Sequence, residues 1–205
     1  MSTTILGADN KSRCSWCAVA PEFTAYHDKE WGFPVSDDRR LFEKLSLESF
    51  QSGLSWRTIL VKRENFRAAF HGFDFDRIAR FTQRDIDQLL KDAGIVRHRG
   101  KIEAVVNNAQ RVRDLIKREG SFGAFIWRYE PDASQLAEPQ SVSTSAESTA
   151  LSKELKKMGW KFVGPTTVYA FMQAMGLIND HVEGCVIRDK VDRVRERFTR
   201  PGDNS

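Results

Sequence analysis

Hydrophobic and polar positions follow a helical period along most of the chain. Apolar side chains recur three and four residues apart, which places them on one face of an α-helix. No segment shows the two-residue alternation of a half-buried strand. The pattern therefore predicts an all-α fold, with its clearest helices in residues 39–50, 84–92, 101–116 and 166–175.

Polar residues beside these segments indicate where helices begin and end. Asp37 and Asp38 are candidate N-caps of the helix that starts near residue 39. Thr144 and Glu147 are spaced as a capping box that opens a further helix, and Gly159 is expected to end it.

The distribution of apolar residues predicts one main body with two loose ends. Residues 13–187 are expected to form a single helical domain, because the loop-like stretch 131–145 connects helices rather than independent units. Residues 1–12 and 188–205 have few apolar anchors, so we expect both to be flexible.

Composition and charge narrow the class of protein. The chain is 40% hydrophobic and 29% charged, which is typical of a globular domain. No apolar run reaches the roughly 18 residues of a membrane helix, and the N-terminus lacks a signal-peptide core, so we expect a cytoplasmic protein without a membrane partner. Lys and Arg number 32 against 28 Asp and Glu, which allows nucleic-acid binding but also suits solvated helix faces.

The cysteines and histidines near the two ends are candidate metal ligands. A redox pair at Cys14 and Cys17 would need a βαβ setting, which the pattern does not predict. His181 and Cys185 are spaced to share one side of a turn, and His27 is a further candidate. A structural zinc site takes four such ligands, so five candidates compete for four places. Spacing alone favours including the adjacent cysteine pair, and inert buried thiols are the alternative.

Glu48 lies on the helical stripe that contains Leu41, Leu45 and Ser52, where an apolar residue would suit a buried face. A buried carboxylate must be paired, hydrogen-bonded or neutral. Glu48 is therefore either a glutamate at the rim of a helix or the floor of a pocket. Aromatic residues close in sequence could wall a pocket for a flat or cationic ring, or could be ordinary core: Trp16, Phe23, Tyr26, Trp31 and Trp56.

The segment GWKFVGPTT, residues 159–167, connects two predicted helices. Hairpins of this kind can present backbone N–H groups to a DNA phosphate beside a helix N-terminus. Gly164 and Lys161 are the candidate DNA contacts, although any connection between helices can contain glycine.

Eight stretches in order give a more specific indication: RCSW, AYHDKEWGFP, LFEKLSLE, QSGLSW, KRENFRAAF, DAGIVRHRGKI, LKKMGWKFVGPT and FMQAMGLINDHVEGC. From about Arg13 to Ile187 the chain resembles the DNA-3-methyladenine glycosylase I family of the helix-hairpin-helix superfamily. The resemblance implies a helix-hairpin-helix DNA glycosylase fold, with the motif at about residues 151–176.

The resemblance also implies a ligand set for zinc. The family's structural zinc ligands fall here on Cys14, His27, His181 and Cys185, which would join the N-terminal and C-terminal segments. Cys17 falls outside this set. Four protein ligands leave no position for water, so this zinc would stabilise the fold.

The family's base pocket falls on Glu48, Tyr26, Trp56 and Trp16. By resemblance, Glu48 would accept hydrogen bonds from the adenine edge, and the aromatic rings would stack on the flipped base. Leu54, in the QSGLSW turn, would enter the duplex as a wedge near the lesion.

The implied reaction is hydrolysis of the N-glycosidic bond of 3-methyladenine in double-stranded alkylated DNA after base flipping. The family lacks the usual catalytic aspartate, and Asp180, beside a zinc ligand, is expected to be structural. Catalysis would then rest on the lability of the charged base and on Glu48. No lysine stands where bifunctional relatives have their nucleophile, so we expect a monofunctional enzyme without lyase activity. Separately, we expect no obligate protein partner.

Three alternatives remain open at this point. The chain could be a zinc-stabilised DNA-binding module, a zinc hydrolase with an activated water, or a glycosylase for another damaged purine. Release of free base from alkylated DNA separates the DNA-binding module from a glycosylase of the resembled family. If the zinc were catalytic, chelation would abolish hydrolysis at once. The shape of the pocket determines which damaged purine a glycosylase would accept.

Overall fold

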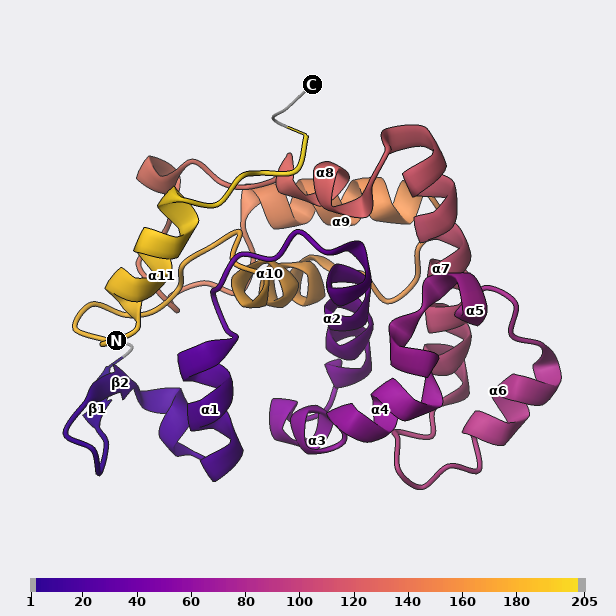
Figure 1. Cartoon of the computed structure of the whole chain (residues 1–205), viewed down its shortest axis with the longest axis horizontal. Coiled ribbons are helices and arrows are strands. Elements are labelled where there is room, and N and C mark those ends of the chain that lie inside the picture. The colour runs from indigo at the N-terminus through magenta and orange to yellow at the C-terminus, as the bar shows by residue number, and fades with distance from the viewer. Residues whose placement is uncertain (1–2, 203–205) are drawn as a thin grey trace.

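The computed structural model of the chain describes residues 3–202. Most of these residues are helical, and one small antiparallel sheet lies near the N-terminus (Figure 1). The helices and strands, in chain order, are β1 (Thr4–Leu6), β2 (Ser12–Cys14), η1 (Ser15–Ala18), α1 (Pro21–Lys29), α2 (Asp38–Gln51), α3 (Trp56–Val61), α4 (Arg63–Ala69), η2 (His71–Phe73), α5 (Phe75–Ile78), α6 (Gln83–Leu89), α7 (Arg99–Glu119), α8 (Phe122–Trp127), η3 (Ala133–Gln135), α9 (Ala146–Lys157), α10 (Pro165–Ala174) and α11 (Arg188–Glu196).

The four helices predicted from periodicity are confirmed as α2, α6, α7 and α10. Asp37 caps α2, because its carboxylate accepts from the Arg40 N–H at 2.8 Å. The predicted capping box of α9 was placed one residue too early: Ser145 and Ser148 form it. Ser148 is fully buried, so its hydroxyl is satisfied by the backbone at this position.

The N-terminal segment corrects the all-α prediction. β1 pairs with β2 in antiparallel register, with Thr4 opposite Cys14. Arg13 fastens this hairpin, since its guanidinium donates to the carboxylates of Asp9 and Asp28 at 2.7–3.0 Å. Strands of three residues are too short for an alternation to show, so the hydrophobic pattern did not predict the hairpin, and the few apolar residues in 1–12 led us to expect flexibility there. Residues 1 and 2 of that range lie outside the described part.

The charged C-terminal segment, for which we expected flexibility across 188–205, contains helix α11. Val191 on this helix is fully buried. Arg195 donates to the Gly176 carbonyl and to a carboxylate oxygen of Glu130, the latter at 2.8 Å. Charged side chains therefore anchor this helix together with the buried Val191. Residues 203–205 lie outside the described part.

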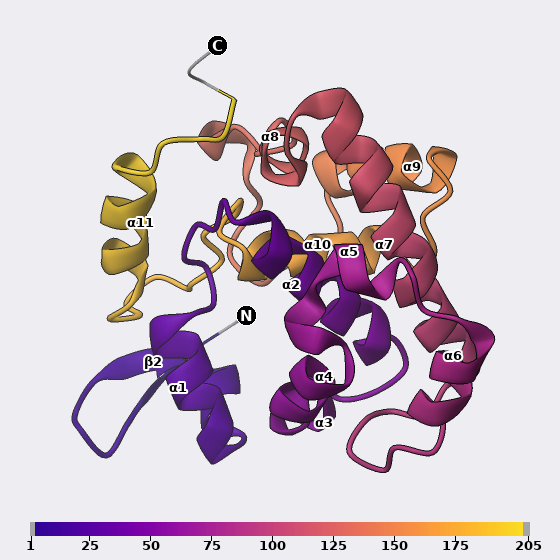
Figure 2. The same cartoon turned by 45° about the vertical axis from the view of Figure 1, so that its right-hand side comes forward.

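Helices α2 and α10 lie in the middle of the molecule, and the other elements surround them (Figures 1 and 2). The hairpin, α1 and α11 lie on one side, and α3 to α7 lie on the other. The core under α2 is rich in fully buried phenylalanine, including Phe42, Phe50, Phe66, Phe70 and Phe73. This arrangement brings α1, α2, the start of α3 and α10 around one cavity. None of the helices within residues 3–202 is both long and apolar enough to cross a membrane.

Candidate base pocket and metal site

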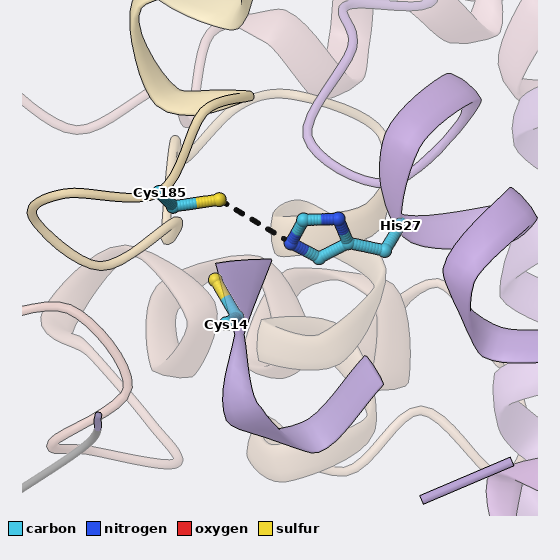
Figure 3. A group of neighbouring side chains, drawn as sticks. All are labelled: Cys14, His27 and Cys185. Atoms are coloured by element: carbon cyan, nitrogen blue, oxygen red, sulfur yellow. Dashed lines mark hydrogen bonds between the residues drawn. The ribbon is translucent and has the colours of Figure 1, made fainter. Parts of the chain in front are cut away.

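Three side chains from distant parts of the chain form a buried group of possible metal ligands (Figure 3). Cys14 ends β2, His27 lies on α1, and Cys185 lies in the loop before α11. Their ligand atoms lie within 4.8 Å of one another. A backbone bond from the Val186 N–H to the Ser12 carbonyl, at 2.8 Å, fastens the C-terminal loop beside β2 and so brings the two cysteines together.

The imidazole of His27 is oriented by a carboxylate. Its Nδ1–H donates to Asp28 at 2.8 Å, and the same carboxylate accepts from Arg13. The other ring nitrogen, Nε2, then points toward the sulfur of Cys185 at 3.5 Å. A carboxylate behind a histidine in this way fixes the tautomer that a metal ligand requires.

His181 lies against this group with a free nitrogen. Its ring centroid is 4.8 Å from that of His27, and its Nδ1–H donates to the Asn179 side-chain oxygen at 2.8 Å. Its Nε2 is buried and has no hydrogen-bond partner within residues 3–202. Burial lowers the pKa of His181 to about 4, so the ring is neutral at pH 7 and Nε2 is a bare acceptor.

The two thiols interact closely. The Cys14 thiol lowers the pKa of Cys185, and the same interaction raises the pKa of Cys14. Two thiolates this close would need a cation between them. Cys17 is also buried but lies in a small separate cluster with Ala20 and Phe23, so the pairing of Cys14 with Cys17 suggested by spacing alone is wrong.

A cavity of about 200 Å³ opens beside this group, between α1, α2, α3 and α10. It has an aromatic wall and one carboxylate, and it is lined by Trp16, Tyr26, Trp31, Glu48, Gln51, Trp56, Ala170 and Gln173. The four residues that the family resemblance assigned to a base pocket therefore lie together. Its size suits a flat ring system such as one nucleobase.

Glu48 forms the charged end of the cavity and is only 5% exposed. Lys44, one helical turn earlier on α2, lies with its Nζ 2.7 Å from Glu48 Oε1. The same ammonium donates to the Tyr26 hydroxyl at 2.8 Å and lies 3.5 Å from the ring centroid of Trp56. Burial raises the pKa of Tyr26 well above its usual value, so its phenol stays protonated.

Trp16 and Trp31 connect the cavity to the metal-ligand group. Their ring centroids are 5.0 Å apart, and each packs on His27, at 5.4 and 6.2 Å. Trp31 also contacts the His181 ring at 4.7 Å. The metal-ligand group therefore supports one wall of the cavity.

Asp180 holds the loop beside the cavity. It is 3% exposed, and its carboxylate accepts from the Gln140 N–H at 3.0 Å and from the Gln173 side chain at 2.5 Å. Burial raises the pKa of Asp180 despite these bonds. The interactions are those of a structural residue, and through Gln173 they reach the lining of the cavity.

Two exposed turns adjoin helices that line the cavity. Leu54 is 40% exposed in the turn after α2, and Lys101 holds that turn by donating to the carbonyls of Phe50 and Ser52. The second turn is the hairpin between α9 and α10. Asn108 on α7 exchanges two hydrogen bonds of 2.9 Å with the backbone of Lys161 in this hairpin.

Sequence reasoning missed four lining or adjacent residues, namely Lys44, Gln51, Ala170 and Gln173. Lys44 had a detectable signal, because it stands four residues before Glu48 on a helix and so faces it. Ala170 and Gln173 on α10 had no such signal in the sequence, because only the fold brings that helix next to α1 and α2.

Comparison with known proteins agrees with this geometry. Residues 16–189 match the methyladenine glycosylase family. The chain is 48% identical over 177 residues to DNA-3-methyladenine glycosylase 1 of Escherichia coli K12, covering 84% of this chain and 95% of that protein. It is 47% identical over 178 residues to a DNA-3-methyladenine glycosylase of Haemophilus influenzae, covering 85% of this chain and 96% of that protein.

Solved structures give the same result. A crystal structure of 3-methyladenine DNA glycosylase I superposes with a TM-score of 0.79 at 46% identity, over 85% of this chain and 98% of that one. The enzyme from Staphylococcus aureus, studied for its recognition of 3-methyladenine, superposes with a TM-score of 0.78 at 39% identity, over 84% and 95%. The chain therefore belongs to the methyladenine glycosylase family.

Proposed function

We propose that this protein is a DNA glycosylase that hydrolyses the N-glycosidic bond of 3-methyladenine in alkylated double-stranded DNA. The observation that carries the proposal is Glu48 at the charged end of a small aromatic cavity, in a chain whose relatives are named for this activity. Initiation of base-excision repair follows from the removal of such a base. A glycosylase for another damaged purine is the nearest alternative, and the base released in the assay below separates the two.

The cavity would receive the base after the nucleotide is flipped out of the duplex. Trp16 and Trp56 offer ring faces for stacking, and the Glu48 carboxylate would accept hydrogen bonds from the exocyclic amine edge of adenine. Because N3-methylation gives the base a positive charge, its C1′–N9 bond is already weak. Glu48 would orient the base while the bond breaks, and water would complete the hydrolysis at C1′.

DNA would be held by the two exposed turns. Leu54 has the exposure and the apolar side chain of a wedge that fills the space left by the flipped base. Gly164 is the N-cap of α10, and no side chain within residues 3–202 caps that helix end. A Cβ on Gly164 would meet no described atom within 4 Å, so this helix end is open to an external group such as a phosphate. Lys161, exposed beside it, would add positive charge.

The α9–α10 unit would then be the helix-hairpin-helix motif, within a single domain that spans residues 13–187. This assignment rests on the connection of the two helices through Gly159 and Gly164 and on their direct packing. We expect a cytoplasmic protein that acts without an obligate protein partner.

A structural zinc ion would be bound by Cys14, His27, His181 and Cys185. The residues fit the ion, since the sulfurs and His27 already converge and the buried Nε2 of His181 lacks a partner within the described residues. Bound zinc would tie β2 and α1 to the loop before α11 and so stabilise the wall of the cavity. No step of the hydrolysis is assigned to it.

The proposed enzyme is monofunctional. Lys44 lies against the cavity lining, but its Nζ is engaged by Glu48 and Tyr26, and its side chain is only 7% exposed. Borohydride should therefore trap no covalent complex between the protein and DNA.

The test of the proposed function is release of free base from methylated duplex DNA, with the product identified by chromatography. Release of 3-methyladenine without strand cleavage is the expected result. Release of a different purine would favour the other glycosylase reading. Binding of methylated duplex with no base released would favour a DNA-binding module.

A further inference from the structure

The loop before α7 lies between the two turns to which the proposed function assigns DNA contacts. His98, at the end of this loop, packs its ring on Phe162 of the α9–α10 hairpin, with 6.3 Å between the ring centroids. Lys101, in the first turn of α7, donates to two backbone carbonyls at the C-terminal end of α2 and so holds the turn that carries Leu54. A duplex that touches both turns would therefore run past residues 97–101.

The basic side chains of this loop divide into engaged and free ones. Arg99 is held by Asp87 at 2.8 Å and by Glu103 at 3.6 Å. Lys101 is buried and satisfied by the carbonyls it holds. Arg97, in contrast, is exposed and has no hydrogen bond or ion pair with any other residue in 3–202. Only Arg97 therefore offers its full positive charge to a partner outside the chain.

His98 offers a hydrogen-bond donor whose tautomer is fixed. Its Nδ1 accepts from the Lys101 N–H at 3.2 Å, which caps α7. An imidazole that accepts at Nδ1 carries its proton on Nε2, so Nε2–H is a donor even while the ring is neutral. His98 is exposed, and Nε2 has no hydrogen-bond partner in the described part of the chain. The cap bond and the contact with Phe162 together hold the ring in place.

We propose that Arg97 and His98 form a third DNA contact, in which the Arg97 guanidinium and the His98 Nε2–H bind phosphate oxygens of the backbone between the Leu54 turn and the α9–α10 hairpin. This inference rests on the proposed function. The ligand is the phosphodiester backbone of the substrate duplex. Such a contact adds affinity and fixes the position of the duplex, but it reads no base.

The two side chains act on the phosphate in different ways. Arg97 neutralises one phosphate charge and releases counterions, so its contribution falls as the salt concentration rises. His98 donates as a neutral ring, so its contribution should depend little on salt. Because the His98 ring is fixed on the protein, it sets where the bound phosphate lies relative to Leu54. This difference in salt dependence separates a charge contact from a hydrogen bond.

The experiment measures binding of the full chain to a short fluorescein-labelled duplex by anisotropy, over a series of NaCl concentrations. The proteins are wild type, Arg97→Ala, His98→Asn and the control Arg99→Ala. Asparagine keeps an acceptor for the helix cap but has no group at the place of Nε2. The control removes the same charge as Arg97→Ala from the same loop, at a residue that is already ion-paired.

Arg97→Ala should weaken binding about tenfold at low salt and reduce the slope of log K against log salt by about 1. His98→Asn should weaken binding about fivefold at every salt concentration, with the wild-type slope. Arg99→Ala should stay within about twofold of wild type. His98→Ser, which also keeps the cap, replaces His98→Asn if that variant does not fold.

A second measurement locates the bound phosphate. A duplex with a tetrahydrofuran abasic site fixes the register, and a neutral methylphosphonate replaces one phosphate at a time. One position near the abasic site should weaken binding by wild type but not by Arg97→Ala, because the variant has already lost that charge contact. Equal effects on wild type and Arg97→Ala at every position would contradict the assignment.

Wild-type affinity and salt slope in folded Arg97→Ala and His98→Asn would overturn the inference. An equal loss in Arg99→Ala would also overturn it, since the effect would then be general charge rather than a contact. A loss in Arg97→Ala alone would remove His98 from the contact. In each case base release by wild type leaves the proposed function standing. If wild type does not bind duplex DNA at all, the proposed function is wrong, and the inference falls with it.

Discussion

Replacement of Asn179 by alanine tests how the proposed zinc site is built. The Asn179 side-chain oxygen accepts from His181 Nδ1 at 2.8 Å, and its amide donates to Asp192 at 2.7 Å and to the Arg188 carbonyl at 3.1 Å. Asn179 is 7% exposed, so water would replace these partners poorly. The change removes the group that orients His181 and both hydrogen bonds from this side chain to helix α11.

The magnitude follows from these contacts. Loss of a hydrogen bond behind a histidine ligand lowers metal affinity about 10- to 100-fold. That factor corresponds to about 1.4–2.7 kcal/mol. In the metal-free protein, three lost hydrogen bonds at about 1 kcal/mol each should lower the unfolding free energy by about 3 kcal/mol. The Tm should fall by about 6–12 °C for a chain of this size.

Zinc affinity is measured by competition with a chromophoric chelator, and Tm is measured with and without zinc. Asn65→Ala is the matched control, because Asn65 is an exposed asparagine with one hydrogen bond, to the Gly94 carbonyl at 3.2 Å. The control should leave zinc affinity unchanged. Wild-type zinc affinity in Asn179→Ala, or an equal loss in the control, would refute the assignment of His181 as a ligand.

Three further changes test other parts of the account. Gly164→Ala should keep the unfolding free energy within about 0.5 kcal/mol of wild type but weaken binding to duplex DNA severalfold, as measured by fluorescence anisotropy. Gly159 has φ +84°, so Gly159→Ala should lower the unfolding free energy by about 1 kcal/mol, as measured by denaturant titration. Asn108→Ala removes both 2.9 Å bonds to the hairpin backbone and should cost about 2–3 kcal/mol of unfolding free energy together with DNA affinity; unchanged affinity would contradict the role of the hairpin. Burial alone would raise the pKa of Glu30, but the Arg63 guanidinium lowers it below 4.5. This ion pair therefore stabilises the fold above pH 4.5, and its contribution disappears as the pH falls through the lowered pKa of the folded state. Urea titrations across that range should show that Glu30→Gln loses less unfolding free energy on acidification than wild type does.

The sequence predicted the helices well where periodicity was long. Residues 101–116 lie within α7 and 166–175 overlap α10 almost fully, because an apolar stripe over several turns has one stable arrangement. The β1–β2 hairpin was missed because each strand has only three residues and all three residues of β1 are exposed to solvent. Helix α11 was missed for a different reason: Arg195 and Val191 anchor it by long-range contacts that local composition does not show.

The site could be predicted only in part for the same reason. Spacing favoured Cys14 with Cys17, but the fold places Cys14 beside Cys185, and 170 residues of chain separate the two. Only the resemblance to a family pointed to that pairing in advance. Glu48 was found from its position on an otherwise apolar stripe, whereas Lys44 was overlooked although its spacing from Glu48 is local.

The most direct test of the central claim is the single-turnover rate of base release from methylated duplex DNA by wild type and Glu48→Ala, with both proteins shown to be folded and zinc-loaded. The account predicts that wild type releases 3-methyladenine and that the variant, which lacks the carboxylate of the cavity, is slower by about 100-fold or more. Release at the wild-type rate by Glu48→Ala would contradict the assignment of this cavity as the base pocket.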